Sequence, residues 1–324
     1  LFMGVFIKTL YTPQKTSLVT LSILVGLAIL IRPVHYALIP LLILFIPLYH
    51  HLYAWSFRLL LRNLLIPVTF LILLGCTGQY IKHGFFALEN KSGFNMIGKV
   101  ALIADEEISS RHSDLLKDLV TFAVSVRTYI DHAPILSLRF LLSSPYYDHF
   151  RYETLKTIQP AYSDAIYQQT AIDIIKARPF KYLRDVWMNY CALWQVYELL
   201  TLEERHQLDA FVKTYNPAPY MPDHWKPETL LLSLQLPSAM VWILRICLCI
   251  VALSGMGFMM IAFKHTKNRS ILVATMAALV VHGHYLLIAL SQAGLPRYGF
   301  ALWPAIVLGA IILPILLFKK REKS

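Results

Sequence analysis

Arg32 is a charged residue in an otherwise apolar stretch that runs from Gly26 to Leu44. Charges in hydrocarbon are costly and are usually retained for a function. Pro33 has no backbone N–H and interrupts a helix at this point, with His35 close by in the sequence. A guanidinium group presents a planar fork of donors that suits phosphate oxygens. We therefore predict that Arg32 binds the phosphate of a lipid-linked ligand, with His35 as an auxiliary group. The alternative is an ordinary arginine that anchors the chain at the membrane interface.

A second arginine, Arg297, stands next to Tyr298 just before the last apolar run of the chain. We predict the same lipid phosphate-binding role for Arg297 and Tyr298, again with an interface anchor as the alternative. Arg245 lies well inside another apolar run. It either reaches toward the membrane surface or points into the helical bundle, and we include it as an auxiliary phosphate-binding residue.

These residues belong to a chain with the composition of a membrane protein. Of its 324 residues, 57% are hydrophobic, whereas about 45–50% is usual for soluble domains. Six apolar segments approach the length that a bilayer requires: Ser17–Ile31, Val34–Tyr49, Leu60–Gly78, Leu236–Phe263, Ile271–Leu290 and Gly299–Phe318. The first two are short and are predicted to form either a tight hairpin or one kinked pair. The fold class is therefore all-α, a polytopic helical membrane protein with about six spans.

Charged residues divide the chain into three parts. Neither Leu1–Leu88 nor Thr229–Arg321 contains Asp or Glu. Alternate short loops are basic, which marks them as cytoplasmic: Lys8, Lys15, Arg58, Arg62, Lys264, Lys267, Arg269, Lys319, Lys320, Arg321 and Lys323. The net charge of +11 therefore reflects topology and does not indicate nucleic-acid binding. We predict an N-terminal membrane part (1–79), an extracytoplasmic domain (80–235, Tyr80–Gln235) and a C-terminal membrane part (236–324) with a basic cytoplasmic tail.

The extracytoplasmic domain is predicted to be helical. One helix is expected over Asp105–Asp131, with acidic residues in its first turn, and another over Pro160–Ala177. Pro179 is expected to begin a third helix. Thr201 and Glu204 fit a capping box for a helix that ends near Lys213. The third helix carries an apolar and aromatic stripe that is expected to be core or to rest on the membrane surface: Phe180, Leu183, Trp187, Tyr190, Trp194 and Tyr197.

The sequence offers no clear catalytic or metal-binding constellation. An outward-facing general base or acid would come from a carboxylate or a histidine. Asp148 has the most site-like surroundings, but a solvated loop is the preferred interpretation. His282 and His284 are two residues apart in an apolar helix, so they point to different faces. The four cysteines do not have the spacing of metal ligands. We therefore expect no metal and no cofactor.

Three stretches together resemble the polyprenyl-phosphate-dependent glycosyltransferases of the C-type superfamily, which includes protein mannosyltransferase-like and aminoarabinose transferase-like enzymes. They are GLAILIRPVHYALIPLLIL from Gly26, AIDIIKARPFKYLRDVWMNYCALW from Ala171 and GLPRYGFALWPAIVLGA from Gly294. The resemblance covers the C-terminal two-thirds of such enzymes. It implies transfer of a sugar from a polyprenyl-phosphate donor at the extracytoplasmic face to an acceptor that it does not identify.

The resemblance also implies site residues. Arg32 matches the basic position that contacts the lipid phosphate, and Arg297 with Tyr298 matches an Arg-Tyr pair near the donor pocket. The family's catalytic Asp lies in its first outer loop, and nothing in this chain matches it. We therefore expect that the chain is N-terminally incomplete and that its catalytic acid lies upstream of Leu1. We expect the protein to reside in a bacterial inner membrane.

Two other classes remain open. An O-antigen ligase or polymerase-like protein would also combine a large outer loop with outward arginines, for a lipid pyrophosphate. A non-enzymatic transporter of lipid-linked glycans, or a structural membrane subunit, is the third reading. A transport route is expected to contain polar or broken helices at the bilayer midplane, and the apolar runs here argue against it.

Overall fold

The computed structural model describes residues 2–31, 35–36, 38–88, 92–131, 163–194, 201–215, 237–262 and 269–291. In these residues every regular element is a helix, and there is no strand. Three helices are long and apolar enough to cross a membrane, over Phe57–His83, Ser238–Gly257 and Ile271–Leu290. The all-α class is confirmed, and these three helices are compatible with a membrane protein. The predicted sixth span, Gly299–Phe318, lies outside the described residues.

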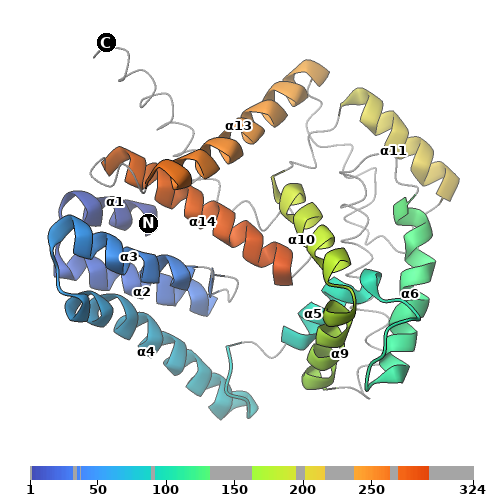
Figure 1. Cartoon of the computed structure of the whole chain (residues 1–324), viewed down its shortest axis with the longest axis horizontal. Helices are drawn as coiled ribbons and strands as arrows, with labels where there is room; N and C mark the ends of the chain where they lie inside the picture. Colours follow the sequence, from blue (N-terminus) through green and yellow to red (C-terminus); the bar gives the residue numbers. More distant parts are fainter. Residues whose placement is uncertain are drawn as a thin grey trace. The chain divides into compact units, whose positions relative to one another are not determined.

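The helices form two compact units (Figure 1). The first unit is Leu1–Asn90, Ile250–Leu287 and Ala301–Ser324, and the second is Lys91–Cys249 and Ile288–Phe300. Among the described residues, the first unit holds α1 (Phe2–Tyr11), α2 (Lys15–Ile31), α3 (Leu38–Tyr53), α4 (Phe57–His83) and the adjoining parts of α13 (Ser238–Ala262) and α14 (Arg269–Ser291). The second holds α5 (Ser92–Val100), η2 (Ala101–Ile103), α6 (Ser113–Asp131), α9 (Asp164–Ala177), α10 (Pro179–Leu193) and α11 (Leu202–Tyr215), with the remaining ends of α13 and α14.

In the first unit, α2 and α3 form a hairpin. Tyr53, at the end of α3, donates a hydrogen bond to the carbonyl of Leu10, just before α2 begins. The chain therefore reverses direction between α2 and α3. Of the two alternatives, a tight hairpin or one kinked pair, the structure shows the hairpin. Both α2 and α3 pack against α4 (Figure 1). The interface of α2 with α4 is close, because a Cβ atom on Gly26 would lie 2.6 Å from Cδ1 of Leu71.

A serine compensates for a proline inside α4. Pro67 has no N–H, and its ring disturbs the helical hydrogen bonds around it. The hydroxyl of Ser22, in α2, donates to the carbonyl of Leu64 at 2.5 Å and accepts from the N–H of Val68 at 3.0 Å. These two backbone groups are one helical turn apart and would ordinarily pair with each other. Ser22 therefore satisfies the backbone of α4 where the proline weakens it.

In the second unit, α5 and α9 are held together at their N-termini. The carboxylate of Asp164, the first residue of α9, accepts hydrogen bonds from the N–H groups of Gly93 and Phe94 at 3.0 and 2.9 Å. These are among the N–H groups that a helix leaves without an internal partner. A Cβ atom on Gly93 would lie 2.0 Å from the carbonyl oxygen of Asp164. Only glycine permits this approach of the two backbones.

Three predicted helix boundaries can be compared with the structure. Pro179 begins α10, and α11 starts directly after Thr201, as the sequence predicted. The prediction that one helix begins at Asp105 is wrong, because α6 begins at Ser113 and Asp105 precedes it in a non-helical segment. The physical reason is that Asp105 and its neighbours bind cations of another helix, as described below.

Candidate functional site

The three residues predicted to bind the lipid phosphate directly, Arg32, Arg297 and Tyr298, lie outside the described residues. The same holds for Asp148. The two auxiliary residues, His35 and Arg245, are described, and they lie in different units. The neighbours of His35 and of Arg245 are described in turn.

His35 lies in a short 3₁₀ turn between α2 and α3 and contacts α14. Its ring centroid is 4.8 Å from that of His284, with the ring planes inclined by 41°. His284 is only 1% exposed. Both residues belong to the first unit. The turn at residues 35–36 therefore packs against α14, and each side contributes one imidazole to the contact.

His282 faces a different neighbour. A Cβ atom on Gly255, in α13, would lie 2.9 Å from Nε2 of His282. His282 therefore packs against α13, whereas His284 packs against His35. The prediction that these two histidines point to different faces is confirmed. Within the described part of the chain, no three His, Cys, Asp or Glu side chains gather as a metal site would require.

Arg245 is bound by an acid of the second unit. Its guanidinium donates to both carboxylate oxygens of Glu204, at 2.9 and 2.8 Å. The Cζ atom also lies 5.2 Å from the centroid of the Trp242 ring, within the range of a cation–π contact. Neither alternative for Arg245, the membrane surface or the interior of the bundle, included this ion pair with Glu204. A phosphate that bound Arg245 would have to compete with Glu204.

Glu204 is held in place by its own helix as well. Its backbone N–H donates to Oγ1 of Thr201 at 3.2 Å, and its carboxylate accepts from the N–H of Thr201 at 2.8 Å. The predicted capping box is therefore confirmed. Burial raises the pKa of Glu204, but the hydrogen bonds from Arg245 and Thr201 outweigh it, and the pKa lies below its usual value. Glu204 is an ionised structural acid.

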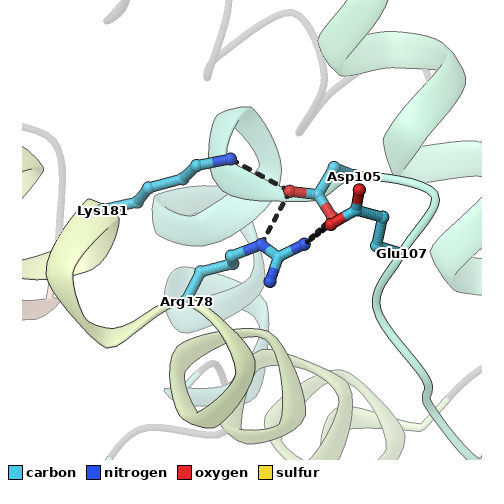
Figure 2. A network of polar contacts seen from close by, with 4 residues as sticks. All are labelled: Asp105, Glu107, Arg178 and Lys181. Atoms are coloured by element: carbon cyan, nitrogen blue, oxygen red, sulfur yellow. Dashed lines mark hydrogen bonds and ion pairs between the residues drawn. The ribbon is translucent and has the colours of Figure 1, made fainter.

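A second group of charges joins the start of α10 to the segment before α6 (Figure 2). Arg178 donates to both oxygens of Asp105, at 2.9 and 3.0 Å, and to Glu107 at 2.5 Å. Lys181 donates to Asp105 at 3.0 Å. The hydrogen bond from Arg178 lowers the pKa of Asp105 to about 2, with a further contribution from Lys181. Asp105 is accordingly an anchor for two cations and is poorly suited to act as a base near neutral pH.

A further charged pair among the described residues of the second unit has a buried lysine. Lys99, in α5, lies 2.5 Å from Asp185 of α10, and the lysine side chain is only 3% exposed. Asn189 also donates to Asp185, at 3.0 Å. Burial lowers the pKa of Lys99, and the adjacent carboxylate of Asp185 opposes that shift. This pair was not predicted, since Lys99 and Asp185 are far apart in the chain and a long-range ion pair leaves no periodic pattern in the sequence.

The aromatic stripe divides into two parts. Tyr190 is buried, as expected for core, and its ring stacks on Trp187 at 5.7 Å. Phe180, Leu183 and Trp187 are exposed. The prediction of core therefore holds for only part of the stripe. Tyr197 lies outside the described residues.

The chain matches no protein-family model, no curated protein and no solved structure at a significant level.

Proposed function

We propose that the chain is part of a membrane glycosyltransferase that takes a sugar from a polyprenyl-phosphate donor at the extracytoplasmic face. The proposal includes six spans, an extracytoplasmic domain at Tyr80–Gln235 and a bacterial inner-membrane location. Its basis in the sequence is the resemblance carried by the Gly26, Ala171 and Gly294 stretches.

The structural observation that supports the proposal most directly is the contact of His35 with His284. His35 follows Arg32 by three residues in the sequence. Imidazole and guanidinium groups supply donors for phosphate oxygens, and phosphate is the group that must be bound and stabilised as it leaves.

Four acids of the second unit have structural roles and are poor candidates for a catalytic base. Asp105, Glu204, Asp185 and Asp164 bind cations or helix N-termini. These four carboxylates are therefore engaged in contacts within the second unit. We assign Arg32, Arg297 and Tyr298 to binding of the lipid phosphate, with His35 as the auxiliary group.

Donor-lipid binding tests the proposal. The full chain in nanodiscs is titrated with a fluorescent polyprenyl phosphate and, separately, a polyprenyl pyrophosphate. We expect Arg32→Ala and Arg297→Ala each to weaken binding of the monophosphate by tenfold or more, since loss of one charged hydrogen-bond donor costs about 1.5–3 kcal/mol. Arg58→Ala, a basic residue at the start of α4, is the matched control and should bind normally.

Unchanged binding in both arginine variants would refute the proposal. Tighter binding of the pyrophosphate than of the monophosphate would instead favour the ligase or polymerase-like class.

A further inference from the structure

The helix α10 has two faces of different character. Val186, Asn189 and Leu193 are buried, and they lie on the side of α10 that packs within the second unit. On the other side, Phe180, Leu183 and Trp187 are 84%, 55% and 61% exposed. Their spacing of three and four residues places them in one stripe along the helix. A row of three large apolar side chains on a surface marks a place where something other than water covers them.

The hydrogen bond of Tyr182 attaches this helix to the last residues of a candidate membrane span, which belong to the same unit. The Tyr182 hydroxyl donates to the carbonyl of Leu290 at 2.7 Å. Leu290 is the last residue of the candidate span Ile271–Leu290, and the last carbonyls of a helix have no partner within it. Since the end of a span lies at the membrane interface, the first turn of α10 is attached at that level.

A second attachment comes from α11, which follows α10 in the chain. The N–H of Leu202 donates to Oγ of Ser238 at 3.5 Å, and Ser238 is the first residue of the candidate span Ser238–Gly257. Consecutive spans cross a bilayer in opposite directions. The start of α13 and the end of α14 therefore emerge on the same side, and both attachments belong to one membrane surface.

The charge pattern along the stripe fits a lipid surface better than a second protein. Arg184 is exposed and lies between Phe180 and Trp187 at helical spacings of four and three residues, so it belongs to the same face of the helix as both aromatic residues. Tryptophan and arginine together are typical of the headgroup region, where an apolar body is buried and a polar group stays hydrated. Lys181 takes no part in this surface, because its ammonium group binds Asp105.

We propose that α10 is an interfacial helix of this protein, lying in the headgroup region of the bilayer that α13 and α14 cross. Phe180, Leu183 and Trp187 insert among the acyl chains, and Arg184 binds lipid phosphates. The proposal is independent of the chemistry proposed above, since it concerns the lipid surface and not the sugar donor.

The test places an environment-sensitive fluorophore on Trp187→Cys or Phe180→Cys in the full chain, with the four native cysteines replaced by serine, in nanodiscs. Lys117→Cys, on the exposed side of α6 in the same unit, is the matched control. We expect the fluorophores at 187 and 180 to emit at shorter wavelength than at 117, to be quenched several-fold more by lipids spin-labelled near the headgroup, and to be protected from iodide in solution.

Two results would overturn the proposal. Quenching by iodide as strong at 187 and 180 as at 117 would show that the stripe faces water. Protection from both iodide and the spin-labelled lipids would show that a protein surface, such as a second copy of the chain, covers it. Two labelled positions guard against a substitution that disturbs the helix at one of them.

Discussion

An arginine inside an apolar helix needs either an acidic partner or contact with water. Arg245 has an acidic partner, Glu204. The pair with Glu204 is bidentate, and both side chains are mostly buried, at 24% and 15% exposure. Pairs of this kind are costly to break, because each charge left behind is poorly solvated. The capping box of Thr201 makes the pair stronger still, since it fixes the carboxylate before Arg245 binds it.

A double-mutant cycle measures this pair. Glu204→Gln removes the charge and keeps a side chain suited to the capping box, and Arg245→Met keeps the apolar stem. We expect the two changes to be non-additive in the free energy of unfolding, with a coupling of roughly 1–3 kcal/mol. Unfolding in detergent with increasing denaturant provides the measurement. Additive effects would show that Arg245 gains its stability from Trp242 and not from Glu204.

The carboxylate of Asp105 gives the protein a stability that depends on pH. Its pKa is about 2 in the folded chain against an ordinary value of 3.8. The stabilisation is therefore fully present above about pH 4 and is lost as the pH falls toward 2. We expect Asp105→Asn to lower the melting temperature at pH 7, with a difference from wild type that shrinks below pH 4. Asp114→Asn, at an exposed acid of α6, is the control for the loss of a surface carboxylate.

Some of these partners could have been predicted from the sequence. Arg245 stands in an acid-free part of the chain, so an acidic partner had to come from the second unit, and Glu204 was already marked by its capping box. Asp105 was assigned to a helix N-terminus because acids there are favourable. Arg178 lies 73 residues away, and a long-range ion pair of this kind leaves no periodic pattern in the sequence.

At the scale of the helices, the interface between α2 and α4 contains one hydroxyl, that of Ser22, which binds the backbone of α4. Pro67 weakens α4 within its apolar candidate span, and inside a membrane no water would satisfy the freed backbone groups. Ser22 supplies both a donor and an acceptor at that point. The sequence shows the proline, but which serine would meet it depends on how α2 and α4 pack.

Ser22→Ala should therefore destabilise the first unit. Loss of the hydroxyl removes the hydrogen bonds that the carbonyl of Leu64 and the N–H of Val68 make with Ser22. We expect a decrease of about 1–2 kcal/mol in the free energy of unfolding. Thr20→Val is the control, since that hydroxyl only binds the carbonyl of Thr16 in its own helix, and a change within about 0.5 kcal/mol is expected. Equal effects of the two changes would contradict the bridging role.

The lengths of the helices bear on the number of spans. At 1.5 Å per residue, α2 with 17 residues and α3 with 16 are about 26 and 24 Å long, shorter than the ~30 Å of a hydrocarbon core. Their hairpin either crosses a thinned bilayer twice or enters and leaves on one side. Both cases return the chain to the same surface before α4, so the sidedness of every later loop is independent of the choice.

The predicted topology leads to opposite accessibility for two positions. Cysteine placed at Lys117 should react with a membrane-impermeant maleimide added outside intact cells, whereas cysteine at Lys267 should react only after permeabilisation. The reason is the excess of basic residues in the loops assigned to the cytoplasm. The inverse labelling pattern would overturn the extracytoplasmic placement of Tyr80–Gln235, and with it the proposed donor site.

The bond between Glu204 and Arg245 also constrains how the chain is made. Glu204 is synthesised 41 residues before Arg245, so the acid has left the ribosome before the fourth apolar helix enters the translocon. An arginine in an inserting segment opposes its entry by a few kcal/mol. We therefore expect insertion of this helix to be easier when Glu204 is already in place to pair with Arg245.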